Sequence, residues 1–508
     1  MSSTPQGAWR ARRGPRRALA GIGCVLAMGV VAASAQAASW QHGQGHGGGK
    51  LVPGNLLVST TNYAPAAITA GVTKLPPECG TTAAAAPCAT AVADGDDFPS
   101  VFNNASIDAF FGIASPVYLD ELSPWGRHIA TIPVPADQFA TSFSSKSELA
   151  LNLSPEGNYV SFMGYDATPG EIDVSNANTR GVIDPGNGDV GQYYRVAAQL
   201  DRWGHFTFTR TNAYSGDNGR AAITNDEHGQ DLLYAAGNAG QSKSPPGSGS
   251  NGVNTVYFVD TTGKACPSTS ATPGVGLPVP GAQLPTSPPN LAVQNLGSTS
   301  KPNNALLPTN MCILKGFPTT LAASTTSPIN YPFGMWFAND RTLYVADEGS
   351  GDNTYDSATN TYVNSTAAAQ PEAGLEKWVL SGGSWRLAYT LQNGLDLGQP
   401  YTIPGYPTGL NTGPGGGGGP WSPATDGLRA LTGRVGRDGV ATIWAVTSTV
   451  SGSGDTGADP DKHVTTSDPV AAVTPPSWER FWTVRTAKFG QVLRGVSFTP
   501  GTDSESDR

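Results

Sequence analysis

Three arginines stand in short frames of small residues, and a guanidinium group is well suited to holding an oxyanion. Arg220 and Arg429 each follow a glycine closely and precede an alanine, while Arg180 stands between a threonine and a glycine. Two or three guanidinium groups that converge on one point would bind a carboxylate or a phosphate through paired hydrogen bonds. The alternative is structural, because a buried arginine commonly ties neighbouring elements together through an acidic side chain or a loop carbonyl.

An acidic pair, Asp347 and Glu348, directly follows a short apolar stretch. Adjacent side chains of a strand point to opposite faces, so these carboxylates can share one ligand only if the chain turns there. Gly349 indicates such a turn. Carboxylates and loop carbonyls are ligands that Ca²⁺ prefers, which makes the pair a candidate metal site. The alternative is a loop that simply needs polar turn residues.

Signatures of other catalytic classes are missing from the sequence. It contains no G-x-S-x-G, H-E-x-x-H or C-x-x-C-H motif. Nucleophilic catalysis of the serine-hydrolase kind and zinc-dependent proteolysis are therefore not indicated.

The elements that would position the arginines and the acidic pair repeat along the chain. In each repeat an apolar run, a polar turn rich in Asn, Asp and Gly, and a second apolar run follow one another. This pattern predicts a β-hairpin, and its recurrence predicts a repeat architecture. The four copies are residues 147–162, 220–235, 334–346 and 429–446.

Hairpins of a second type lie between these copies, at residues 117–134, 195–209, 376–391 and 480–498. Their alternation of apolar and polar residues is typical of half-exposed antiparallel strands. An inner hairpin followed by an outer one makes a four-stranded sheet, and a ring of such sheets is a β-propeller. We therefore predict an all-β fold, a propeller of about seven four-stranded antiparallel blades with long irregular loops.

The N-terminal segment has the features of a signal peptide. A basic region is followed by an apolar stretch too short to remain a membrane anchor, and then by the cleavage signature Ala35-Gln36-Ala37. We expect residues 1–37 to be a signal peptide, 38–54 a flexible Gly/His-rich lead-in, 55–500 one propeller domain and 501–508 a disordered tail. The strand at 55–60 is expected to complete the last sheet, built by residues 480–498.

The mature chain keeps four cysteines, Cys79, Cys88, Cys266 and Cys312. An even number of cysteines in an exported protein favours disulfides over a metal site. Four cysteines allow three pairings. We favour Cys79–Cys88 and Cys266–Cys312, because each pair lies within one loop-rich region.

Composition restricts the partners that the protein can have. Charged residues make up 14% of the chain, compared with about 25% in a typical globular protein. The formal net charge is −9, which argues against a nucleic-acid partner. We expect a monomer, secreted or periplasmic, with no membrane span in its mature chain and with a small-molecule or cell-surface ligand.

Residues 333–349, FGMWFANDRTLYVADEG, resemble the blades of secreted NHL-like and SMP-30-like propellers, and LEKWVLSGGSWRLAYT at 375–390 continues the blade in the same manner. The resemblance implies a propeller fold over about half of the chain. Lactonases of this class hold a divalent metal in the central channel with acidic and amide side chains. By that analogy Asp347 and Glu348 would be the metal ligands here.

Two functional hypotheses follow. The first is a secreted, non-catalytic propeller that binds a ligand or a surface component through its top-face loops and central channel. The second is a metal-dependent, lactonase-like hydrolase or lyase that acts on a small anionic substrate, with the acidic pair and Arg220 and Arg429 in the channel. A catalytic site needs convergent polar groups in a concave pocket, whereas arginines paired between blades would favour the first hypothesis.

Overall fold

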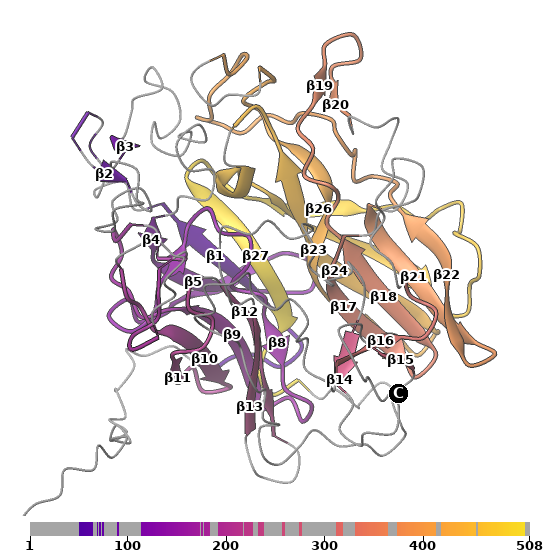
Figure 1. Cartoon of the computed structure of the whole chain (residues 1–508). Helices are drawn as coiled ribbons and strands as arrows, with labels where there is room; N and C mark the ends of the chain where they lie inside the picture. The colour runs from indigo at the N-terminus through magenta and orange to yellow at the C-terminus, as the bar shows by residue number, and fades with distance from the viewer. Residues whose placement is uncertain are drawn as a thin grey trace, which may run out of the picture. The chain divides into compact units, whose positions relative to one another are not determined.

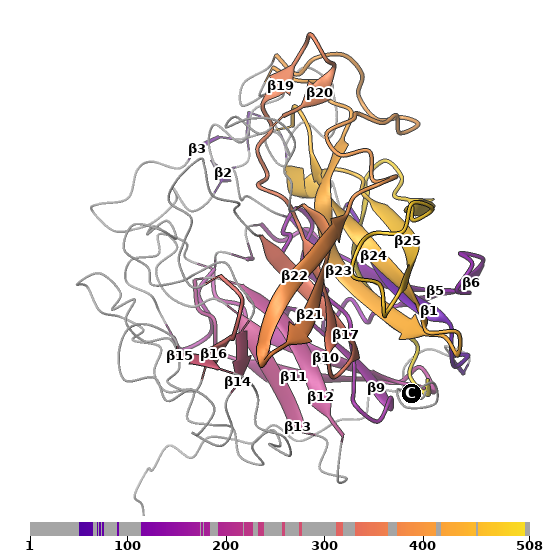
Figure 2. The same ribbon diagram turned by 90° about the vertical axis from the view of Figure 1, so that its right-hand side faces the viewer.

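In the computed structural model the described residues belong to the unit Gln44–Arg508 and form mainly antiparallel sheets (Figures 1 and 2). The structure describes residues 50–63, 69, 71–72, 74–75, 89–90, 113–172, 174–175, 177–182, 191–216, 218–226, 232–237, 257–259, 274–276, 311–318, 331–363, 373–412, 418–453 and 456–502.

Four antiparallel sheets of four strands make up most of the described chain, in a propeller-like arrangement. Sheet I consists of β27 (Gln491–Phe498), β1 (Leu56–Asn62), β5 (Val117–Leu122) and β6 (His128–Pro133), in that order. Sheet II consists of β8 (Asn152–Leu153), β9 (Tyr159–Tyr165), β10 (Arg195–Asp201) and β11 (Phe206–Thr211). Sheet III consists of β17 (Pro332–Asn339), β18 (Thr342–Asp347), β21 (Gly374–Ser381) and β22 (Ser384–Leu391). Sheet IV consists of β23 (Ala424–Val435), β24 (Val440–Val450), β25 (Lys462–Pro469) and β26 (Trp482–Thr486).

Smaller sheets complete the strand inventory of the described residues. β12 (Gly219–Asn225) and β13 (Leu232–Gly237) form an antiparallel hairpin, and β14 (Tyr257–Val259), β16 (Met311–Leu314) and β15 (Gly274–Gly276) form a mixed sheet. Three two-stranded pieces are β2 (Lys74–Leu75) with β3 (Ala89–Thr90), β4 (Ala114–Ser115) with β7 (Thr141–Ser142), and β19 (Tyr355–Asp356) with β20 (Thr361–Tyr362).

Helix is nearly absent, as the sequence predicts. In the described ranges the helical content is one turn of 3₁₀ helix, η3 (Thr456–Ala458). None of the residues placed by the structure belongs to a helix long and apolar enough to cross a membrane.

All four predicted inner hairpins are confirmed as antiparallel strand pairs, namely β8–β9, β12–β13, β17–β18 and β23–β24. Three of the four outer hairpins are confirmed as β5–β6, β10–β11 and β21–β22. In the outermost strand β6, exposed residues alternate with less exposed ones from Ile129 onward, as expected. β6 buries only Ile132, whereas every residue of β18 in the middle of its sheet is buried. A central strand packed on both faces has no reason to alternate.

The prediction of a fourth outer hairpin, at residues 480–498, is wrong. The first half of this segment is β26, which pairs with β25 at the outer edge of sheet IV, while its second half is β27, which pairs with β1. The chain therefore leaves one sheet at its outer edge and enters the next at its inner edge. The N-terminal strand does join the C-terminal one, as expected: Leu56 lies opposite Phe498 (Figure 1, β1 and β27).

The expected seven blades are not supported. The described residues form four four-stranded sheets instead. The described strands between β13 and β17 are the three short ones of the mixed sheet, β14, β15 and β16.

The hydrophobic core lies between neighbouring sheets. Leu57, Leu119 and Phe162 belong to a cluster that joins sheets I and II, and Trp444 and Val496 to one that joins sheets IV and I. A third cluster joins sheets III and IV. Burial of apolar surface between faces is the main favourable term in folding, so it is these inter-sheet contacts that hold the sheets side by side.

A buried ion pair also joins sheets III and IV. The Lys377 ammonium on β21 lies 2.7 Å from the Asp468 carboxylate on β25, and neither side chain is exposed. Tyr344 and Tyr389 donate hydrogen bonds to the same carboxylate. Burial lowers the pKa of Lys377, and the contact with Asp468 opposes that shift. Removing one partner would leave the other charge buried and unpaired.

We expect Lys377→Met to lower the free energy of unfolding by about 3–5 kcal/mol, because Asp468 is left in the core without its cationic partner. The control is Lys488→Met, at an exposed position, which should change stability by less than about 0.5 kcal/mol. Urea denaturation followed by tryptophan fluorescence measures both. Equal stabilities of the two variants would show that the pair does not hold these sheets together.

Candidate functional site

The first strands of the sheets lie next to one another. β17 packs beside β23, β23 beside β27, β27 beside β8, and β8 beside β12 (Figure 1). We call these the inner strands. Glycines permit the close approach: a Cβ on Gly334 of β17 would collide with the backbone carbonyl of Arg429, and one on Gly495 of β27 with that of Leu149. Polar side chains from these strands and from the adjoining loops therefore gather in one region.

Arg429 on β23 is buried and fully engaged. Its guanidinium group donates one hydrogen bond to Glu348, which follows β18, and another to the backbone carbonyl of Lys146, which precedes β8. It also lies 3.9 Å from the ring centroid of Phe333. Arg429 thus ties sheets II, III and IV together, which is the structural alternative that the sequence left open.

Arg494 on β27 is a second buried arginine of the inner strands, and sequence reasoning missed it. Its guanidinium group donates to the carbonyls of Ser145 at 3.0 Å and Phe143 at 3.0 Å, and also to that of Gly457. Asp461 lies 3.5 Å away as a counter-charge. The signal was present, because Arg494 precedes a glycine just as the other inner-strand arginines precede an alanine.

Arg220 on β12 differs from these two. Its Nε is buried, and none of its nitrogens makes a hydrogen bond or ion pair with another described residue. The charge of Arg220 lies close enough to Arg429 to affect the pKa of Arg429. Burial, and next the positive charges of Arg494 and Arg220, lower the pKa of Arg429 to about 10 against the opposing effect of Glu348. Arg220 thus lies within electrostatic range of Arg429, and the convergence of the two on one ligand stays a prediction.

Arg180 does not join them. Its side chain is exposed, and its guanidinium carbon lies 5.7 Å from the ring centroid of Tyr194.

The acidic pair diverges. Asp347 is buried, and its two carboxylate oxygens accept hydrogen bonds from the backbone N–H groups of Tyr331 at 2.6 Å and Gly349 at 2.9 Å. Glu348 turns to Arg429 instead. In the part of the chain that the structure describes, no three His, Cys, Asp or Glu side chains are grouped so as to hold a metal ion.

Four further ionisable groups lie near the arginines, and sequence reasoning named none of the four. They are Lys146, Asp426, Asp459 and Asp461. The half-buried Lys146 donates to Thr456 at 3.0 Å, and burial together with the charge of Arg429 lowers its pKa. We call the whole set the inner-strand cluster: Lys146, Arg220, Asp347, Glu348, Asp426, Arg429, Asp459, Asp461 and Arg494.

Four aspartates of the inner-strand cluster have raised pKa values, in each case chiefly because burial disfavours the charged form. The value is about 7 for Asp347, Asp459 and Asp461 and about 6 for Asp426. Arg494 opposes the shift at Asp461 and Lys146 opposes it at Asp426. These carboxyl groups hold their protons close to neutral pH.

The predicted disulfides remain predictions. Cys79, Cys88 and Cys266 lie outside the described residues, and for Cys312 only the backbone of β16 is described.

Comparisons with known proteins give little. No family model and no curated protein matches the sequence. A mutant of the Synechocystis apocarotenoid oxygenase is similar in structure, with 9% identity and a TM-score of 0.23, over 76% of this chain. The match spans 59% of that protein's length. Similarity at this level assigns neither a family nor a function.

We expect stability to fall as pH rises from about 6 to 8. The four aspartates keep protons in the native state that they release on unfolding, where their pKa is near 3.8. The loss of stability from each group is steepest below its folded pKa, at up to about 1.4 kcal/mol per pH unit, and fades above it. His463 is buried, and its pKa is lowered to about 3. It therefore makes stability rise with pH, but only below about pH 6.5, the ordinary pKa of histidine.

Thermal melting across this pH range measures the effect. Asp459→Asn mimics the protonated side chain, and its amide oxygen can still accept the hydrogen bond that Tyr406 donates to Asp459. The variant should therefore melt with a shallower pH dependence than the unmodified protein. A melting temperature that rises between pH 6 and 8 would contradict the assignment of protons to these groups.

Proposed function

We propose that this protein is a ligand-binding protein that holds a small carboxylate or phosphate anion at the inner-strand cluster. Arg220 is the anchoring residue. The observation that carries the proposal is a guanidinium group that makes no hydrogen bond to another described residue, beside the buried Arg429. A guanidinium group offers five N–H donors in a fork that matches an oxyanion.

The neighbouring cations support the anion without being its main donors. Arg429 and Arg494 donate hydrogen bonds to Glu348 and to backbone carbonyls. Their charges nevertheless act on whatever Arg220 binds, because Coulomb interactions inside a protein are stronger than in water. The half-buried Lys146 adds a fourth positive charge to the same region.

The alternative, a metal-dependent hydrolase or lyase, has weaker support. Its two candidate ligands are engaged elsewhere: Asp347 accepts from two backbone N–H groups, and Glu348 pairs with Arg429. A Ca²⁺ ion needs six to eight oxygen ligands, so the pair would have to give up these partners and recruit others. A non-catalytic binding role requires no such rearrangement.

The setting proposed for this activity is outside the cytosol. The basic N-terminal region, the short apolar stretch and the Ala-Gln-Ala site favour export to the periplasm or the exterior. The four cysteines of the mature chain would then be oxidised in pairs. A monomer suffices for binding, because all residues of the inner-strand cluster come from one chain.

We expect Arg220→Gln to weaken binding of inorganic phosphate or succinate about ten- to a hundredfold, the loss of a charged hydrogen-bonding group. Isothermal titration calorimetry of the full chain measures the dissociation constants. Arg180→Gln is the matched control, since it removes an exposed arginine outside the cluster.

Two outcomes would reject the proposal: no binding of either anion by the unmodified protein, or equal affinity in Arg220→Gln. The metal-dependent alternative has its own readout. Ca²⁺ should raise the melting temperature, and EDTA should lower it, only if the acidic pair holds a cation.

A further inference from the structure

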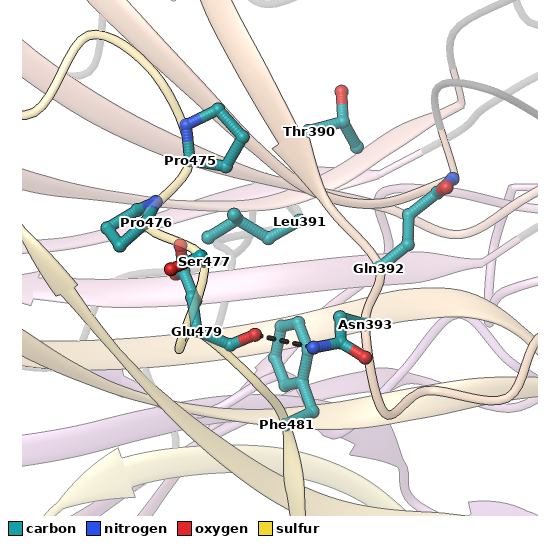
Figure 3. A pocket seen from close by; sticks show the side chains of 9 residues that line it. All are labelled: Thr390, Leu391, Gln392, Asn393, Pro475, Pro476, Ser477, Glu479 and Phe481. Carbon is teal, nitrogen blue, oxygen red and sulfur yellow. Dashed lines mark hydrogen bonds between the residues drawn. The ribbon is translucent and has the colours of Figure 1, made fainter.

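A pocket of about 340 Å³ lies away from the inner strands, between the end of β22 and the loop that joins β25 to β26 (Figure 3). Its wall mixes apolar and polar side chains. The apolar ones are Leu391, Pro475, Pro476 and Phe481. The polar ones are Thr390, Gln392, Asn393, Ser477 and Glu479.

Glu479 is the one charged side chain of this wall, and it is only 4% exposed. Neither of its carboxylate oxygens has a hydrogen-bond donor among the described residues. Its backbone is firmly held, because its N–H donates to the carbonyl of Pro476 at 3.1 Å and its carbonyl accepts from the Asn393 side chain at 2.7 Å (Figure 3). A buried carboxyl group without a partner costs free energy, and the fixed backbone keeps Glu479 in the pocket wall.

The charged neighbours of Glu479 cannot supply the missing partner. Lys377 has three hydrogen-bond donors and uses them on Tyr389 at 2.9 Å, on Asp468 at 2.7 Å and on the carbonyl of Pro469 at 2.7 Å. Tyr344 and Tyr389 both donate to Asp468. This network is complete without Glu479, and its ion pair has no net charge.

We propose that this pocket binds a small organic cation, a primary ammonium group on a short apolar chain, with Glu479 as its counter-ion. The ammonium would donate to Glu479, while the chain packs against Leu391, Phe481 and the two prolines. A hard divalent metal fits less well, because it seeks many oxygen ligands and the wall carries one carboxylate. This site is separate from the anion site proposed above and does not depend on it.

The pocket predicts a proton linkage. Burial, and next the charge of Asp468, raise the pKa of Glu479 to about 8, while Lys377 opposes the shift. Without ligand the carboxyl group is therefore mostly protonated at pH 7. An ammonium ion favours the ionised form, so its binding releases a proton. Affinity should rise by up to tenfold per pH unit between about pH 6 and 8, and level off above.

The test uses n-butylammonium with the full chain, followed by calorimetry and by the fluorescence of the adjacent, exposed Trp478. We expect a dissociation constant on the order of 1 mM at pH 8. Titration in two buffers of different ionisation enthalpy should reveal release of close to one proton at pH 7. The uncharged n-butanol should bind at least about tenfold more weakly, because it lacks the charge that pairs with Glu479.

Glu479→Gln keeps the shape of the side chain and removes its charge. It should weaken n-butylammonium binding at pH 8 by about tenfold or more and abolish the pH dependence. Glu156→Gln is the matched control, since that residue is exposed at the turn between β8 and β9. Because a buried charge is removed, Glu479→Gln should melt no lower than the unmodified protein at pH 9, which checks that it is folded.

Three outcomes would overturn the proposal. They are no binding of n-butylammonium by the unmodified protein up to about a hundredfold above the expected dissociation constant, binding of n-butanol with equal affinity, and unchanged affinity and pH dependence in Glu479→Gln. The first would mean that the pocket holds only water. The other two would mean that any binding is apolar and independent of the carboxylate.

Discussion

The hydrogen bonds from two buried arginines to one short backbone segment hold the inner strands together. Arg494 on β27 donates to the carbonyls of Phe143 and Ser145, and Arg429 on β23 donates to that of Lys146. These bonds satisfy three carbonyls of the segment 143–146, and a buried carbonyl without a donor is costly. Each arginine brings a charge into the interior; Glu348 pairs with Arg429, and Asp461 lies 3.5 Å from Arg494.

In this arrangement the polar groups that stabilise the fold differ from those proposed to bind ligands. The fully engaged groups join sheets, as Arg429 does near the inner strands and the Lys377–Asp468 pair does between sheets III and IV. The buried polar atoms without a hydrogen-bond partner among the described residues include the Nε of Arg220 and both carboxyl oxygens of Glu479. One group is basic and the other acidic, and they lie at separate places, so the two proposed sites would take different ligands.

The sequence predicts the local pairs well and their assembly less well. The order of apolar run, polar turn and second apolar run identifies hairpins such as β23–β24, because both strands and their turn are adjacent in the chain. The segment 480–498 has the same appearance, yet its two strands pair with β25 and β1. Local pattern does not encode which edge a strand joins. Assigning β27 to an outer hairpin also concealed Arg494 as a buried residue of the inner strands.

Protonation decides which charge the inner-strand cluster presents. With Asp347, Asp426, Asp459 and Asp461 protonated, the only carboxylate left is that of Glu348, and it faces four cations. Once all four aspartates ionise, five carboxylates face the same cations and the sign of the cluster reverses. An anion is therefore attracted while the aspartates are neutral and repelled when they ionise. The same burial that raises their pKa values would thus favour the proposed anion below neutral pH rather than above it.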